Sequence, residues 1–214
     1  MIIKLLPVLL FLPLISYNNS STQSISSDEE IGVKAAINTC NYSTSKVFCH
    51  LLYNEYKANP TKEKELELLK YLHDSILTCW YGTRWDFNGT TEQPGKGKIA
   101  CGYFVTTILR DVGVKVNRVK HAQCSSEEMI KAVCPNQTIR RSSNESITSF
   151  TNKISEPGLY IVGLDFHTGF ILKNNDSTYF IHANYTGNRV VEEEIDINSS
   201  VLAASKYKVI GKVI

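Results

Sequence analysis

The stretch Leu159-Tyr-Ile-Val-Gly-Leu-Asp-Phe-His-Thr-Gly-Phe-Ile-Leu-Lys173 opens the region that decides the fold. After Pro157 and Gly158, the helical periodicity of the earlier chain gives way to short apolar runs that are typical of buried strands. A turn-forming segment at residues 174–177 separates two of these runs and predicts a β-hairpin. The predicted strands lie at residues 159–165, 167–173, 178–184, 190–195 and 207–214, with a short helix near Val201.

The chain before this region has apolar residues at helical spacing. Pro60 separates the first two predicted helices, Thr61 caps the second, and Gly113 closes the third. Residues 81–98 contain several glycine turn pairs and predict a loop. The predicted helices span residues 45–58, 61–79 and about 101–112. Helices followed by a meander of strands predict an α+β domain, with N-terminal helices packed on an antiparallel sheet.

The N-terminus has the pattern of a secretory signal peptide. Lys4 precedes an apolar stretch at residues 5–15, after which the chain becomes abruptly polar. The apolar stretch is too short to span a bilayer comfortably, and the alternatives are a membrane anchor or a buried strand. We therefore predict a signal peptide at residues 1–20, a flexible lead-in at 21–30 and one domain at 31–214. This organisation predicts a periplasmic or secreted protein with no integral membrane span after removal of the leader.

Composition and charge exclude some classes of function. The chain has 23 Lys and Arg against 21 Asp and Glu, and 43% of its residues are hydrophobic. These values are typical of an ordinary globular protein, and about 190 residues suffice for one domain with a substantial core. Because no basic run alternates with aromatic residues, we predict no nucleic-acid partner.

Six cysteines leave the disulfide pattern open. Cys40 and Cys49 are close enough in sequence to pair across a loop. Cys124 and Cys134 flank a predicted helix of about ten residues, which would hold their Cα atoms about 15 Å apart. That separation exceeds the roughly 7 Å that a disulfide allows. The alternative is a set of buried thiols. Without a CxxC pair and with scattered histidines, the sequence predicts no zinc site.

Cys101 opens the third predicted helix, directly after a loop rich in glycine and lysine. At such a position, the sulfur faces unpaired backbone N–H groups and the positive end of the helix dipole. Both are expected to lower the pKa of the thiol. Gly102 beside it is expected to leave room for a substrate carbonyl. Cys101 is therefore the candidate nucleophile, and an ordinary buried cysteine is the alternative.

Two histidines of the hairpin are candidates for the base and its partner. His167 starts one strand and His182 lies near the end of the other, so strand pairing makes them neighbours. Cysteine attack needs a base and a third polar group that fixes the imidazole tautomer. His182 and Asn184 share a strand face, and either can be this third group. Structural roles are assigned to the remaining histidines, His50, His73 and His121.

These residues resemble the NlpC-type cell-wall peptidases. The resemblance rests on residues 101–113, 167–171 and 180–183, which supply a cysteine opening a helix, a histidine leading a strand and a Phe-Ile-His-Ala strand, in that order. Residues 81–89 are also similar to that family's aromatic, glycine-containing approach to the cysteine. The similar region covers roughly residues 80–187.

The resemblance implies a papain-like fold, no cofactor, and hydrolysis of amide bonds in peptidoglycan stem peptides. It implies Cys101 as the nucleophile and His167 as the base, and it selects His182 over Asn184 as the third catalytic residue. The candidate substrate-binding residues are Tyr81, Trp85 and Asn184. The expected partner is a peptidoglycan-derived peptide.

The chain departs from the family's pattern next to the nucleophile. The family usually has an aspartate before the cysteine and a serine after it, whereas this chain has Ala100 and Gly102. The segment before the histidine strand is also long, adding residues 124–153. The substrate is therefore open to another amide or a thioester. Two other functions stay open: an inactive module that binds cell-wall peptide, and a secreted antibacterial amidase, which a neighbouring immunity gene would indicate.

Overall fold

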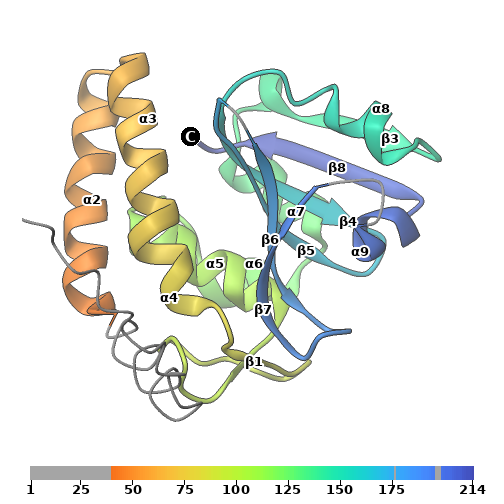
Figure 1. Cartoon of the computed structure of the whole chain (residues 1–214), viewed down its shortest axis with the longest axis horizontal. Coiled ribbons are helices and arrows are strands. Elements are labelled where there is room, and N and C mark those ends of the chain that lie inside the picture. Colours follow the sequence, from red (N-terminus) through yellow and green to blue (C-terminus); the bar gives the residue numbers. More distant parts are fainter. Residues whose placement is uncertain (1–39, 176, 196–198) are drawn as a thin grey trace, which may run out of the picture. The chain divides into compact units, whose positions relative to one another are not determined.

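One mixed β-sheet carries helices on both of its faces (Figure 1). The structure is a computed structural model that describes residues 40–175, 177–195 and 199–214. The predicted signal peptide at residues 1–20 and lead-in at 21–30 lie outside the described residues. The α+β class predicted from the sequence is confirmed. The sheet is not purely antiparallel, however, because β1 and β2 run parallel to each other.

Eight strands in the described residues pair in the order β2-β1-β7-β6-β5-β4-β8-β3. They are β1 (Arg84–Trp85), β2 (Lys98–Ile99), β3 (Arg140–Ser143), β4 (Gly158–Leu164), β5 (Thr168–Lys173), β6 (Thr178–Asn184), β7 (Arg189–Glu194) and β8 (Tyr207–Lys212). The predicted hairpin is β5–β6, in which Phe170 pairs with Ile181 and Lys173 with Thr178. All five predicted strands are present, and the sheet gains three short strands that the sequence analysis did not predict.

The helices match the predicted ones most closely where a cap marks their ends. They are α2 (Tyr42–Ala58), α3 (Lys62–Tyr71), α4 (Thr78–Trp80), α5 (Cys101–Val112), α6 (Arg118–Gln123), α7 (Ser126–Val133), α8 (Ile147–Thr151) and α9 (Ser200–Ala204). The Thr61 side chain accepts a hydrogen bond from the Lys64 N–H, and Gly113 ends α5 with a φ of 110°. The helix predicted at residues 61–79 is interrupted by a π-helical segment, η1 (Leu72–Leu77), and a 3₁₀ turn, η2 (Asn136–Thr138), follows α7.

A separate apolar cluster lies on each face of the sheet. On one face, α2, α3, α5 and α7 pack over strand residues that include Ile161, Phe170 and Ile181. On the other, α8 and α9 cover a set that includes Ile171 and Phe180. Figure 1 shows α5 between the α2–α3 pair and the sheet. This packing holds the start of α5 beside the end of the sheet where β4 turns into β5.

A disulfide joins Cys40 to Cys79, whose Cα atoms are 5.6 Å apart. The two residues meet because α2 and α3 run in opposite directions around the short turn at residues 59–61 (Figure 1). The Cys40–Cys49 pairing considered from the sequence is wrong, since Cys49 is a buried free thiol on α2. Cys124 and Cys134 are also free, as the geometry of the helix between them requires.

In the described ranges, no helix combines the length and the apolar character that crossing a bilayer requires.

Candidate active site

Cys101 is the first residue of α5, and Ala100 precedes it as the helix N-cap. Alanine has no side-chain oxygen to cap the first N–H groups of the helix, so these groups stay directed at the sulfur and the space in front of it. The backbone N–H groups of Thr168, Gly102 and Cys101 itself interact with the thiol. Thr168 follows His167 in the chain. The start of α5 is therefore in direct contact with the start of β5.

Burial raises the pKa of the Cys101 thiol, although the three backbone N–H groups act in the opposite direction. The expectation of a lowered pKa from the helix position is therefore wrong. The physical reason is that removal of the thiolate from water destabilises it more than these N–H groups stabilise it. At neutral pH, Cys101 is a neutral thiol that must lose its proton during attack.

Gly102 is required by the packing of α6 against the start of α5. A Cβ atom on Gly102 would lie 2.3 Å from the carbonyl oxygen of Ala122, closer than any stable contact. Ala122 thus occupies the position that a side chain at residue 102 would take, while Gly102 itself lines the open space next to Cys101. α6 (Arg118–Gln123) therefore forms one wall of the site, directly before the added residues 124–153.

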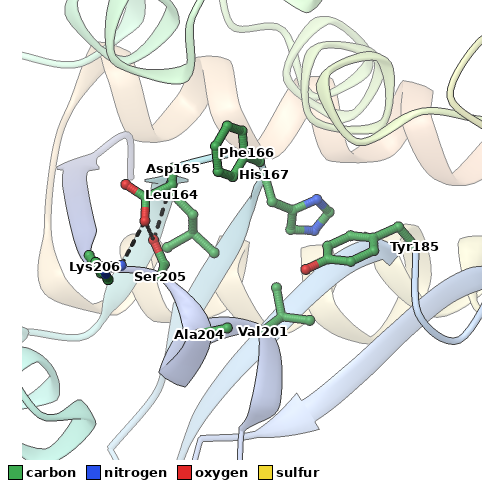
Figure 2. Close-up of a pocket in the computed structure, with 9 residues that line it drawn as sticks. All are labelled: Leu164, Asp165, Phe166, His167, Tyr185, Val201, Ala204, Ser205 and Lys206. Atoms are coloured by element: carbon green, nitrogen blue, oxygen red, sulfur yellow. Dashed lines mark hydrogen bonds between the residues drawn. The ribbon is translucent and has the colours of Figure 1, made fainter.

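His167 lies at the end of the tight β4–β5 turn. The Leu164 N–H donates to the His167 carbonyl at 2.8 Å, which closes the turn. Asp165 ties the turn to the segment before β8, because its carboxylate accepts hydrogen bonds from the Lys206 N–H at 2.7 Å and the Ser205 hydroxyl at 3.2 Å (Figure 2). These bonds lower the pKa of Asp165, the Lys206 N–H most strongly. The turn that carries His167 is therefore anchored at both ends.

The rings of His167 and His182 are joined by a hydrogen bond of 2.7 Å between Nε2 of His167 and Nδ1 of His182. Gly169 makes this contact possible. A Cβ at Gly169 would lie 2.7 Å from Cβ of His182 and 2.8 Å from the Phe180 ring, so any larger residue would displace the His182 side chain. The structure thus brings together the two histidines that the sequence analysis paired.

Glu193 is a member of this site that the sequence analysis missed. Its Oε1 lies 3.4 Å from Nε2 of His182 and accepts a hydrogen bond of 3.3 Å from the Asn184 side-chain amide. Glu193 pairs with Phe180 across β6–β7 and so shares a face with His182. Strand alternation at residues 190–195 predicts which side chains share a face with Glu193. Only the register between β6 and β7 shows that His182 is next to it.

The Glu193 carboxylate fixes both imidazole tautomers. A carboxylate only accepts hydrogen bonds, so Nε2 of His182 carries a proton and Nδ1 of that ring accepts. Nε2 of His167 is then the donor to His182, and Nδ1 of His167 keeps its lone pair. This is the nitrogen that a general base must offer to a thiol.

Both histidines are neutral in the folded protein. Burial, and to a smaller extent the neighbouring His182, lower the pKa of His167 to about 3. Burial also lowers the pKa of His182, while Glu193 acts to raise it. His167 is therefore an uncharged imidazole at neutral pH.

Cys101 and His167 together line two hollows that share part of their walls. One, of about 720 Å³, has five aromatic side chains in its wall, and Trp85 is among them. The other, of about 420 Å³, is lined by polar groups that include His121, Ser126 and Asp165. A third hollow of about 370 Å³ lies behind His167, whose ring packs against Tyr185 with centroids 5.3 Å apart (Figure 2).

The other two predicted substrate-binding residues lie outside these hollows. Tyr81 donates a short hydrogen bond to Glu192, on the face of β7 opposite Glu193. Asn184 is buried, and its Oδ1 accepts hydrogen bonds from the N–H groups of Thr186 and Gly187 at 2.8 Å and 3.1 Å. Asn184 thus holds the β6–β7 turn and positions Glu193.

No protein-family model, curated protein or solved structure matches the chain.

Proposed function

We propose that this protein is a papain-like cysteine hydrolase of the NlpC type that cleaves an amide bond, with Cys101 as nucleophile and His167 as general base. His182 holds His167, and Glu193 holds His182. The observation that supports this most strongly is the chain of hydrogen bonds from Glu193 through His182 to His167. It leaves a basic nitrogen on a histidine that shares two hollows with the Cys101 sulfur.

In the first half of the reaction, Nδ1 of His167 takes the proton of the Cys101 thiol as the sulfur attacks the substrate carbonyl carbon. The N–H groups at the start of α5 stabilise the oxyanion. His167 then returns the proton to the amide nitrogen, the carbon–nitrogen bond breaks, and the amine leaves. The acyl group remains on Cys101 as a thioester.

In the second half, His167 takes a proton from water while the water oxygen attacks the thioester carbon. The carbon–sulfur bond breaks, the acid product leaves, and the proton returns to the sulfur. Throughout, the imidazolium that forms on His167 is stabilised by the hydrogen bond to His182 and by the Glu193 charge behind it.

The resemblance to cell-wall peptidases suggests peptidoglycan stem peptides as the substrate, and the N-terminal sequence suggests a periplasmic or secreted enzyme. The test is incubation of the purified protein with defined muropeptides, with the products identified by mass. We expect one amide bond to be cleaved by the wild type and none by Cys101→Ala, which should remain folded. Cleavage that persists in Cys101→Ala would exclude the proposed mechanism.

A further inference from the structure

The larger of the two hollows beside Cys101 is walled by aromatic side chains from five separate segments. β1, the loop after it, α5, the β4–β5 turn and the β6–β7 turn contribute Trp85, Phe87, Tyr103, Phe166 and Tyr185, respectively. With a volume of about 720 Å³, the hollow is within the range of pockets that bind small organic groups. Segments far apart in the sequence thus place the same type of side chain around one space.

Three of these rings are exposed to solvent, which the fold itself does not require. The exposed fraction is 98% for Phe166, 80% for Phe87 and 41% for Tyr185. Contiguous exposed apolar surface is unfavourable unless a ligand covers it, so such clusters mark binding sites. The Trp85 and Tyr185 rings lie 6.3 Å apart at an angle of 58°, an arrangement that leaves ring faces available for an added aromatic group.

The wall of this hollow carries no charged partner for a ligand. Among the described residues that line it, none is Lys, Arg, Asp or Glu. The Arg118 guanidinium lies over the Tyr103 ring, 4.8 Å from its centroid, and donates hydrogen bonds to Thr107 and to the Thr90 carbonyl, both at 2.8 Å. A charged group entering the hollow would lose water without gaining a counter-charge. An uncharged apolar group would not have this cost of leaving water.

We propose that the aromatic hollow binds an uncharged aromatic group of the substrate, next to the carbonyl that Cys101 attacks. This rests on the proposed hydrolase function and specifies its substrate class as amides that carry such a group on one side of the scissile bond. The second hollow, which is lined by His121, Ser126 and Asp165 among others, then holds the other side of the substrate. The inference extends the substrate class beyond the stem peptides that the resemblance suggests.

The test measures how fast Cys101 reacts with alkylating agents that differ only in their amide substituent. The three probes are iodoacetamide, N-benzyl-2-iodoacetamide and N-(carboxymethyl)-2-iodoacetamide. Each rate is divided by the rate of the same probe with a small free thiol. All proteins in the test carry Cys124→Ser, which removes a free thiol that is partly exposed. Peptide mass mapping identifies the labelled residue. The readout therefore needs no known substrate.

We expect the benzyl probe to react about tenfold or more faster than iodoacetamide, because the hollow buries its ring. Phe166→Ser and Phe87→Ser each remove an exposed ring, so they should fold normally and reduce this preference to threefold or less. Phe48→Ser is the matched control, since Phe48 is 46% exposed on α2 and does not line the hollow. It should leave the preference unchanged.

The outcomes separate this proposal from the proposed function. If Cys101 is labelled first but shows no benzyl preference, or prefers the carboxymethyl probe, the aromatic substrate class is excluded and the hydrolase proposal stands. If the benzyl preference survives in both Phe166→Ser and Phe87→Ser, the hollow is not its source, and the inference also fails. If Cys101 is labelled after another thiol, the hydrolase proposal and this inference fail together.

Discussion

Glu192 and Glu193 are neighbours on β7, yet their side chains lie on opposite faces of the sheet and contact different histidines. Glu193 contacts His182, which is fully buried and continues to His167 beside Cys101. Glu192 lies 2.8 Å from Nε2 of His73, whose Nδ1 contacts Asp74 at 2.8 Å, and it also accepts from Tyr81. These hydrogen bonds connect Glu192, His73, Asp74 and Tyr81, and Cys101 is not among their partners. A histidine–carboxylate pair is thus common to both faces, and only its connection to Cys101 distinguishes a catalytic assembly from a structural one.

Removing each histidine in turn should separate the two clusters most strongly. We expect His182→Ala to lower kcat by about 10³- to 10⁴-fold, because His167 loses the group that fixes its tautomer and stabilises its charge. His73→Ala should leave kcat within about twofold, since His73 has no contact with the site. The measurement is a pair of kcat values on one working substrate. Equal losses in the two variants would contradict the distinction.

The two glutamates allow the same substitution on each face. Glu193→Gln should lower kcat by about 10- to 100-fold, because one hydrogen bond to a charged group is lost. The amide can also donate, so the tautomer of His182 is no longer fixed, and the pH dependence of kcat should change.

Glu192→Gln should instead lower the free energy of unfolding by about 1–2 kcal/mol, because it weakens the ties to Tyr81 and His73. Its kcat and pH profile should match the wild type. Urea unfolding and pH–rate profiles of Glu192→Gln and Glu193→Gln test these two predictions. A wild-type pH profile for Glu193→Gln would show that Glu193 does not position His182.

Asn184→Ala should have a smaller effect on kcat than either change in the catalytic cluster. Asn184 acts on the β6–β7 turn and on Glu193, so we expect a loss of several-fold in kcat together with about 1 kcal/mol of stability. The value is compared with that of His182→Ala on the same substrate. If Asn184→Ala proves the more damaging, the third catalytic residue is Asn184.

The pKa of His167 predicts a change of stability with pH. In the unfolded chain, histidine titrates near pH 6.5, whereas His167 in the folded protein titrates at about 3. Between these values the unfolded state binds a proton that the folded state does not. The free energy of unfolding therefore falls as the pH drops below about 6.5, by up to about 1.4 kcal/mol per unit.

His167→Gln removes this contribution and should give a shallower decrease. The measurement is urea unfolding of both proteins at pH 7, 6 and 5. Parallel decreases in the wild type and the variant would mean that folding does not lower the pKa of His167.

The fold was predictable wherever a local pattern is strong. The Thr61 cap, Gly113 and the apolar alternation of residues 159–184 fix helices and strands from neighbouring residues alone. β1, β2 and β3 were not predictable, because their segments are short or polar and pair only through contacts distant in sequence.

The histidine half of the candidate site was predictable for the same reason, since it lies on one hairpin. The cysteine half depends on long-range packing: α6 against Gly102, the Thr168 N–H at the sulfur, and the burial that raises the thiol pKa. The Glu193 contact required the register of β6 and β7, and the Cys40–Cys79 disulfide required the pairing of two helices. Neither the strand register nor the pairing of the helices can be read from sequence periodicity.

The most direct test of the account is the order in which the four free thiols react. Burial raises the pKa of Cys49 and of Cys134 to about 12, and burial also raises the pKa of Cys124. Cys101 alone combines access from two hollows with backbone N–H groups at its sulfur and a neutral histidine beside it. With stoichiometric iodoacetamide at neutral pH, peptide mapping should find Cys101 labelled ahead of Cys49, Cys124 and Cys134. Preferential labelling of any other cysteine would contradict the assignment of Cys101 as the nucleophile.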